Sequence, residues 1–292
     1  MQKLNNGNIK LAIQKKGRLS EDSIEFLRKA GLEFESYSKS LFASCRNFPL
    51  EILFVRDDDI PDYVETGVVD LGIVGQNLLN ELQPKVKKLL NLRFCFCSLC
   101  LCVPKDSSIS DFYDLNDAKV ATSYPNSTKY FLLKNNIKAK VITINGSVEA
   151  TPVLGIANAI VDLVSTGSTL SANDLKIISK LYDSEAILIS NINLLTNKKK
   201  NALVNKLLTR FKGVLVAKNY KYVMMNAPEK ILPKINKTIP GLKSPTISPL
   251  NSKGWISIQS VIKEDVFWET IEKLKKIGAT GILVLPVEKL IL

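Results

Sequence analysis

The residues best suited to chemistry lie in the segment Glu149–Leu170, which reads EATPVLGIANAIVDLVSTGSTL. The apolar run 159–165 is typical of a strand, and it ends in a turn rich in hydroxyl groups. Gly167 lets backbone N–H groups approach an anion closely, and a helix starting near Leu170 would add partial positive charge. The sequence therefore predicts a cradle for one phosphate group. The cradle would consist of Ser165, Thr166, Gly167, Ser168 and Thr169.

Two carboxylates accompany this turn. Asp162 lies on the preceding strand and Glu149 lies upstream. Either carboxylate could accept hydrogen bonds from ribose hydroxyls or hold a hydrated Mg²⁺. The alternative is a capped structural turn, because Ser and Thr are common there. The segment matches neither the P-loop nor the G-x-G-x-x-G dinucleotide pattern.

Composition removes several classes of function. The chain has no histidine, which excludes imidazole acid–base chemistry and histidine metal ligands. No apolar stretch reaches the roughly 18–20 residues of a membrane span. The polar N-terminal stretch Met1–Asn8 lacks the apolar core of a signal peptide. We therefore expect a cytoplasmic protein with no membrane partner.

The formal net charge of +12 leaves nucleic-acid binding open as an alternative. However, only six of the 40 basic residues are Arg, and the basic residues are spread along the chain. Nucleic-acid readers usually concentrate Arg and aromatic residues on one face. The run Lys198–Lys200 is interpreted as the solvated start of a helix. We therefore expect no nucleic acid, and the charge suits polyanionic small molecules.

Four of the five cysteines lie in the run FCFCSLCLC. The stretch Arg93–Val103 reads as one strand, on which Cys95 and Cys102 would lie roughly 23 Å apart. Four thiolates on one zinc ion must each lie about 2.3 Å from a single point. We therefore interpret these cysteines as packing residues of a buried strand rather than as metal ligands.

Alternating strands and helices must position the candidate site, which predicts an α/β fold with a mostly parallel sheet. In the first half we expect a helix over Glu21–Ala30, capped by Ser20 and ended by Gly31, and another from Asp57 to near Gly67. The expected strands are Ile9–Gln14, Leu50–Arg56 and Val69–Val74.

A second lobe is expected from Pro104. Its predicted helices lie near Ser127–Asn135 and Ser147–Gly155, and a strand at Ala186–Ser190 would return to the first lobe. Its predicted strands are Lys119–Ser123, Ala139–Ile144 and Ala159–Ser165. The expected domains are lobe I at 1–103 with 185–217 and lobe II at 104–184. The cleft between them would lie at the carboxyl ends of the strands, where α/β proteins bind ligands.

Residues 197–217 read as a long amphipathic helix, and the order of elements changes after it. Strands at Tyr220–Asn226, Thr246–Leu250, Trp255–Ile262 and Ile282–Leu285 alternate with helices at Pro228–Thr238 and Asp265–Ile277. This β-α-β-β-α-β order predicts a separate ferredoxin-like domain over 218–292.

The segment Glu149–Leu170 resembles the signature of the ATP phosphoribosyltransferases. Its matching positions are Glu149, Gly155, Ala157, Ile160, Asp162, Leu163, Thr166, Gly167, Thr169 and Leu170. Colinear blocks at 14–19, 56–61, 69–75 and 121–125 also resemble the family, and 244–246 with 283–289 resemble the regulatory domain of its long form. The cysteine-rich stretch departs from the family pattern but lies outside these blocks.

The resemblance implies a two-lobed, periplasmic-binding-protein-like catalytic portion and a C-terminal ACT-like domain. It implies that N1 of the ATP adenine attacks C1 of phosphoribosyl pyrophosphate, which expels pyrophosphate in the first step of histidine synthesis. An sp² nitrogen nucleophile needs no strong base, so the missing histidine is no obstacle. Mg²⁺ would be carried by the pyrophosphate. The turn would hold the 5-phosphate, while Asp162 and Glu149 would hold the ribose.

For ATP the resemblance and the residue types favour Arg18 and Arg56, with Lys15 and Tyr124 as further candidates, because a planar guanidinium suits phosphate. Each has a structural alternative. Arg18 could be an exposed residue before a helix, Arg56 could pair with Asp57–Asp59, and Tyr124 could pack in a turn. A solute-binding receptor is the rival class for the two lobes, although no signal peptide or reason for the appended domain supports it.

The resemblance also implies assembly of dimers into hexamers and feedback inhibition by L-histidine through the C-terminal domain. The candidate histidine-binding residues are Asn226, Leu242, Ser244, Thr246 and Gly281. Alternatively, Ser244-Pro245-Thr246 is an ordinary turn and Asn226 an ordinary helix cap.

Overall fold

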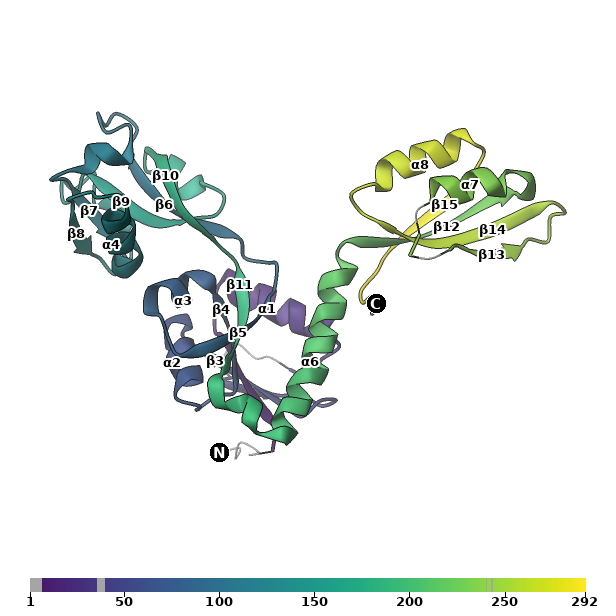
Figure 1. Cartoon of the computed structure of the whole chain (residues 1–292), viewed down its shortest axis with the longest axis horizontal. Helices are drawn as coiled ribbons and strands as arrows, with labels where there is room; N and C mark the ends of the chain where they lie inside the picture. Colours follow the sequence, from purple (N-terminus) through teal and green to yellow (C-terminus); the bar gives the residue numbers. More distant parts are fainter. Residues whose placement is uncertain (1–6, 36–39, 240, 243) are drawn as a thin grey trace. The chain divides into compact units, whose positions relative to one another are not determined.

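The computed structural model describes residues 7–35, 40–239, 241–242 and 244–292 (Figure 1). Most of the polar stretch Met1–Asn8 lies outside these residues. The chain forms two compact units. The first comprises the described residues of Met1–Glu25 and Glu33–Leu203, and the second comprises Phe26–Leu32 and Val204–Leu292.

The first unit contains two lobes, each built on a sheet. The sheet of lobe I has the order β2-β3-β1-β4-β11-β5. Strand β1 pairs in parallel with β3 and β4, whereas β2 pairs antiparallel with β3, and β11 pairs antiparallel with β4 and β5. Both faces of β1 are buried, which explains its apolar sequence IKLAIQ. The strands are β1 (Ile9–Gln14), β2 (Phe42–Ser44), β3 (Leu50–Val55), β4 (Leu71–Gly75), β5 (Val86–Asn91) and β11 (Ala186–Asn191), and the helices are α1 (Arg18–Lys29), η1 (Asp57–Asp59), α2 (Ile60–Glu65), α3 (Gln76–Leu82) and η4 (Ile192–Thr196).

The sheet of lobe II has the order β10-β6-β9-β7-β8. Strands β7, β8 and β9 are parallel, whereas β6 runs antiparallel to β9 and β10. The strands are β6 (Cys97–Pro104), β7 (Lys119–Thr122), β8 (Lys140–Thr143), β9 (Ala159–Val164) and β10 (Leu175–Ser184), and the helices are η2 (Phe112–Leu115), α4 (Pro125–Lys134), η3 (Val148–Ala150) and α5 (Ser168–Ala172). The two lobes confirm the predicted two-lobed α/β architecture.

The boundary between the lobes differs from the prediction. Strand β6 was assigned to lobe I, yet it hydrogen-bonds to β9 and β10 of lobe II, so the chain crosses before Cys97 rather than at Pro104. The stretch Arg93–Val103 is not one strand, because Arg93 and Cys95 adopt left-handed φ angles of 55° and 52°. Cys100 and Cys102 are buried on β6 as expected. The described residues contain no group of three or more His, Cys, Asp or Glu side chains that could hold a metal ion.

Two helix predictions were wrong in detail. Helix α1 begins at Arg18, so Ser20 is a buried residue inside it rather than its cap; Gly17, at φ 93°, makes the turn and its carbonyl accepts the Glu21 N–H. The helix expected over Ser147–Gly155 is only the short η3 followed by turns.

Helix α6 (Lys198–Ala217) begins on the first unit and continues into the second, although lobe I was expected to extend to 217. Lys200 is not solvated as predicted, because its Nζ lies 2.8 Å from Asp70 Oδ1 and the two side chains are 22% and 11% exposed. Asp70 also accepts the Lys10 backbone N–H at 2.9 Å. The pair attaches the start of α6 to the sheet of lobe I.

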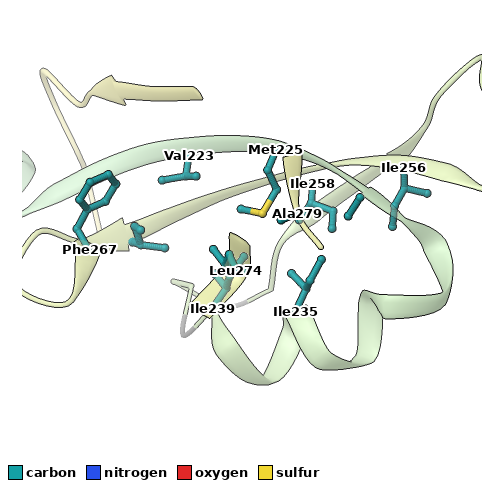
Figure 2. Packing of buried hydrophobic residues seen from close by; sticks show 11 residues of the cluster. Val223, Met225, Ile235, Ile239, Ile256, Ile258, Phe267, Leu274 and Ala279 are labelled. Atoms are coloured by element: carbon teal, nitrogen blue, oxygen red, sulfur yellow. The ribbon is translucent and has the colours of Figure 1, made fainter. Parts of the chain in front are cut away.

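The second unit carries the predicted ferredoxin-like domain. Its antiparallel sheet has the order β13-β14-β12-β15, and helices α7 and α8 lie on one of its faces (Figure 1). Val223 and Met225 from the sheet pack against Ile235 and Leu274 from the helices (Figure 2). Its elements are β12 (Tyr220–Pro228), η5 (Glu229–Ile231), α7 (Leu232–Thr238), β13 (Thr246–Pro249), β14 (Trp255–Lys263), α8 (Phe267–Lys276) and β15 (Thr280–Pro286). Among the described residues, no helix combines the length and apolar character needed to cross a bilayer.

Candidate functional site

The hydroxyl-rich turn follows directly from the end of β9. Gly167 lies at φ 77°, a left-handed conformation that favours glycine, and a Cβ added there would meet nothing within 4 Å. Thr166 Oγ1 and Ser168 Oγ lie 3.0 Å apart, and Ser165 and Thr169 are also exposed. The turn therefore presents hydroxyl groups and backbone to open space. The sequence predicted that the dipole of the following helix would add positive charge at this turn. Helix α5 has only five residues, so its dipole adds little.

The two candidate carboxylates lie close enough to interact. Asp162 is half-buried on β9, and its Oδ1 accepts the Leu163 N–H at 2.7 Å. Burial raises the pKa of the Asp162 carboxyl; the Leu163 N–H opposes this shift, and the negative charge of Glu149 reinforces it. Helix η3 contacts β9, which brings Glu149 of η3 near Asp162. A pair of interacting carboxylates beside a hydroxyl-rich turn suits a sugar phosphate with an associated cation.

A pocket of about 300 Å³ adjoins this arrangement. Its lining includes Arg18 from lobe I and Tyr124 and Ser165 from lobe II, all of which the sequence predicted. Arg56 lines a neighbouring pocket of about 630 Å³, which Tyr124 also lines. Lys15 is exposed and lines neither of these pockets. A further pocket of about 620 Å³ between α3, α4 and β10 includes none of the candidate site residues.

Arg18 stays largely available to a ligand. Its Nε lies 3.9 Å from Asp22 Oδ2, and the Arg18 side chain is 58% exposed, so this ion pair is weak. Cys95 donates its S–H to the same carboxylate at 3.1 Å. Burial and this hydrogen bond raise the pKa of the Cys95 thiol to about 12, so it is not a nucleophile at neutral pH. Cys95, which was expected only to pack within a buried strand, lines this pocket.

Tyr124 connects the lobes. Its hydroxyl accepts a hydrogen bond from Asn77 Nδ2 at 3.3 Å, and its backbone N–H donates to Thr122 Oγ1 at 2.9 Å. Burial, reinforced by the charge of Asp162, raises the pKa of the Tyr124 phenol, which therefore stays neutral. Sequence reasoning missed Asn77, which lies 47 positions away and carries no local motif.

Within one C-terminal domain, only some of the candidate histidine-binding residues lie close together. Gly281, at φ 57°, lies beside Asn226, because a Cβ added to Gly281 would be 3.4 Å from Asn226 Nδ2. Thr246 pairs with Gln259 of β14, so one strand separates β13 from Asn226 on β12. Leu242 and Ser244 are exposed just before β13.

Comparison with known proteins gives matches along the chain. The family model for ATP phosphoribosyltransferase, HisG, matches residues 56–213, and the HisG C-terminal domain model matches residues 217–289. An ATP phosphoribosyltransferase of Cytophaga hutchinsonii is 47% identical over 97% of this chain and 98% of its own length. One from Bacteroides fragilis is 45% identical over 97% of this chain and its entire length.

A solved structure, the ATP phosphoribosyl transferase (HisG:HisZ) complex from Thermotoga maritima, matches with a TM-score of 0.60 at 28% identity. That match covers 70% of this chain and 98% of the Thermotoga chain. The HisG model matches the two-lobed portion from Arg56 onward, and the HisG C-terminal domain model matches the appended domain that follows it. The chain therefore belongs to the ATP phosphoribosyltransferase family, in the long form that carries a C-terminal domain.

Proposed function

We propose that this transferase joins N1 of the ATP adenine to C1 of 5-phosphoribosyl 1-pyrophosphate, releasing pyrophosphate and forming phosphoribosyl-ATP for histidine biosynthesis. The observation that carries the proposal is the meeting of Asp162, Glu149 and the turn 165–169 at the end of β9. One phosphate-binding turn fits the 5-phosphate of a sugar phosphate, and the two carboxylates fit its ribose hydroxyls. Because the reaction consumes ATP, we place it in the cytoplasm.

The transition state sets the roles of these residues. Positive charge builds on the ribose ring as pyrophosphate leaves, so an ionised Asp162 near the ring would stabilise it. The turn would hold the 5-phosphate, while Arg18, Arg56 and Lys15 would neutralise the ATP phosphates. Tyr124 would line the nucleotide pocket between them. Catalysis would then rest on positioning and charge rather than on a base.

The proposed cation, Mg²⁺, fits these residues in a limited way. Asp162 and Glu149 offer two interacting carboxylates, and the described residues contain no group of three or more His, Cys, Asp or Glu side chains that could hold a metal ion. The protein would thus supply at most part of the coordination shell, through Asp162 and Glu149, with pyrophosphate oxygens and water supplying the rest. When bound, Mg²⁺ would neutralise the leaving pyrophosphate.

The first prediction tests the reaction itself. Purified protein given ATP, phosphoribosyl pyrophosphate and Mg²⁺ is expected to release pyrophosphate and form phosphoribosyl-ATP, identified by mass spectrometry. Omission of any one of the three should reduce product formation to background. Folded protein that makes no product under these conditions would falsify the proposal.

For the second unit we propose self-association and inhibition by L-histidine. Tyr222 and Met224 lie on the sheet face opposite α7 and α8, and they pair with Leu285 and Leu283, which are 44% and 46% exposed. An apolar sheet face of this kind supports assembly of dimers into hexamers. The histidine site would lie between neighbouring copies and use Asn226, Leu242, Ser244, Thr246 and Gly281. A shared site explains why one copy leaves Thr246 a strand away from Asn226.

The second prediction concerns this regulation. The double substitution Ser244→Ala with Thr246→Val is expected to raise the histidine concentration for half-inhibition at least tenfold and to leave uninhibited kcat within twofold. The reason is that two exposed hydroxyls are lost far in sequence from the transfer site. Histidine titrations at fixed substrate concentrations measure the concentration for half-inhibition. The control is Ser252→Ala, at an exposed turn of the same domain. If wild-type enzyme neither binds saturating histidine nor is inhibited by it, the proposed regulation is wrong and the domain serves only in assembly.

A further inference from the structure

We infer that Glu81 and Asn77 of helix α3 form a clamp that fixes the first turn of α4, and with it Tyr124, against lobe I. The inference rests on the proposed function, in which Tyr124 lines the nucleotide pocket. It makes Glu81 and Asn77 positioning residues for ATP, acting through Tyr124 and α4 rather than on the reacting atoms.

Glu81 caps a helix that belongs to the other lobe. Its Oε1 accepts the Asn126 N–H at 2.7 Å and its Oε2 accepts the Ser127 N–H at 2.8 Å. Asn126 Nδ2 also donates to the Glu81 carbonyl at 3.0 Å. Helix α4 starts at Pro125, and its N-cap residue Tyr124 provides no side-chain cap. The first turn of a helix leaves its N–H groups unpaired, so Glu81 supplies from lobe I the acceptors that α4 lacks in its own sequence.

Asn77 forms the second half of the clamp, one turn earlier on the same face of α3. Its Nδ2 donates to the Tyr124 hydroxyl, and its Oδ1 accepts the Ser184 hydroxyl at 3.0 Å. The Asn77 backbone N–H donates to Ser184 Oγ, also at 3.0 Å. Ser184 is the last residue of β10, where the chain returns to lobe I. Asn77 therefore ties together lobe I, the returning crossover and lobe II.

The surroundings hold both side chains in place. Asn77 and Glu81 are 8% and 6% exposed, which is unusual for an amide and a carboxylate. A Cβ added at Gly75 would overlap Asn77 Oδ1, so the backbone there leaves room for this amide. Buried polar groups cost free energy unless they are paired, and these two are paired across the lobes. Hydrogen bonds are directional, so the clamp fixes the orientation of α4 as well as its contact with α3.

This arrangement affects the two substrates unequally. The 300 Å³ pocket is lined by Arg18 from lobe I and Tyr124 from lobe II, and the neighbouring pocket is lined by Arg56 and Tyr124. A shift of α4 would therefore change the nucleotide pocket. The phosphate turn and the two carboxylates lie on η3, β9 and the turn after it, all within lobe II, and do not depend on the clamp.

The test is a graded series at Glu81. We expect Glu81→Gln, which keeps one acceptor oxygen, to raise the KM for ATP about tenfold, and Glu81→Leu to raise it further, because each bond to a charged acceptor is strong. The KM for phosphoribosyl pyrophosphate should stay within twofold in both variants. Glu65→Gln, at an exposed site on α2, is the matched control and should change neither KM. Partial unfolding would instead lower kcat with both KM values unchanged, and that result would overturn the clamp.

Hydrogen exchange gives a readout that does not need activity. Peptides covering residues 124–131 should exchange faster in Glu81→Gln than in wild type, while peptides from β9 should not. If wild-type protein has no activity, the proposed function fails, and hydrogen exchange alone then tests the clamp. Unchanged exchange in peptides from residues 124–131 would refute the clamp.

If Glu81→Gln does not fold, a second variant tests the clamp. Tyr124→Phe removes only the oxygen that binds Asn77. It should raise the KM for ATP at least threefold without affecting that for phosphoribosyl pyrophosphate, and an unchanged KM for ATP would count against the clamp.

Discussion

Replacing Asp162 by Asn is expected to lower kcat at least about 100-fold, the usual loss when a preorganised electrostatic contact to a transition state is removed. Asn keeps the shape of the side chain and an oxygen that can accept the Leu163 N–H. It loses the negative charge toward the ribose ring, where positive charge develops. Steady-state rates of pyrophosphate release measure the effect. Asp174→Asn, at an exposed residue paired with Lys105 on the surface, is the matched control and should leave kcat unchanged.

The raised pKa of Asp162 also fixes the sign of two pH effects. Burial is the main cause, so the folded protein holds the Asp162 proton to a higher pH than the unfolded chain does. The stability contributed by the neutral carboxyl is present below the unfolded pKa and lost as pH rises through the raised folded pKa. At pH 7 the ionised carboxyl therefore opposes folding, and Asp162→Asn should melt at the same temperature as wild type or higher.

Activity should follow the opposite course. It should fall as pH drops through the raised pKa of Asp162, above the ordinary aspartate value of 3.8, because the ionised form is the active one. A variant that unfolds at room temperature, or one with wild-type kcat, would contradict the role proposed for Asp162.

The second large effect is expected at the phosphate turn. Gly167→Val should weaken binding of phosphoribosyl pyrophosphate at least tenfold, or about 1.4 kcal/mol, in calorimetry. A Cβ at Gly167 would extend into the open space where the phosphate is proposed to lie, and φ 77° is strained for a β-branched residue. Thr166→Ala with Thr169→Ala, which removes two hydroxyls without backbone strain, should also weaken binding at least tenfold.

The control for backbone strain lies in the other unit. Gly254 has φ 76° and likewise faces nothing within 4 Å, so Gly254→Val introduces a similar strain without touching the turn. It should leave the affinity for phosphoribosyl pyrophosphate unchanged. Unchanged affinity in both the Gly167 and the double Thr variants would mean that the turn is purely structural.

Features that depend on residues close together in the chain could be predicted from their pattern alone. The strand β9 and the turn 165–169 are contiguous, so apolar periodicity and the position of Gly167 were enough to predict them. The β-α-β-β-α-β order of the last domain was read from alternating patterns in the same way. Asp162 was found because it lies on the strand that ends in the turn.

Features that join distant segments could be assigned only once the packing of the chain was known. Strand β6 belongs to lobe II because it hydrogen-bonds to β9 and β10, and its own apolar sequence would suit either sheet. Lys200 was expected in solvent, but it pairs with Asp70, 130 positions away. Glu81 and Asn77 gained their partners from segments 45 to 107 positions away. No local pattern encodes such contacts, because which polar groups meet depends on how the lobes pack and which donors that packing leaves unpaired.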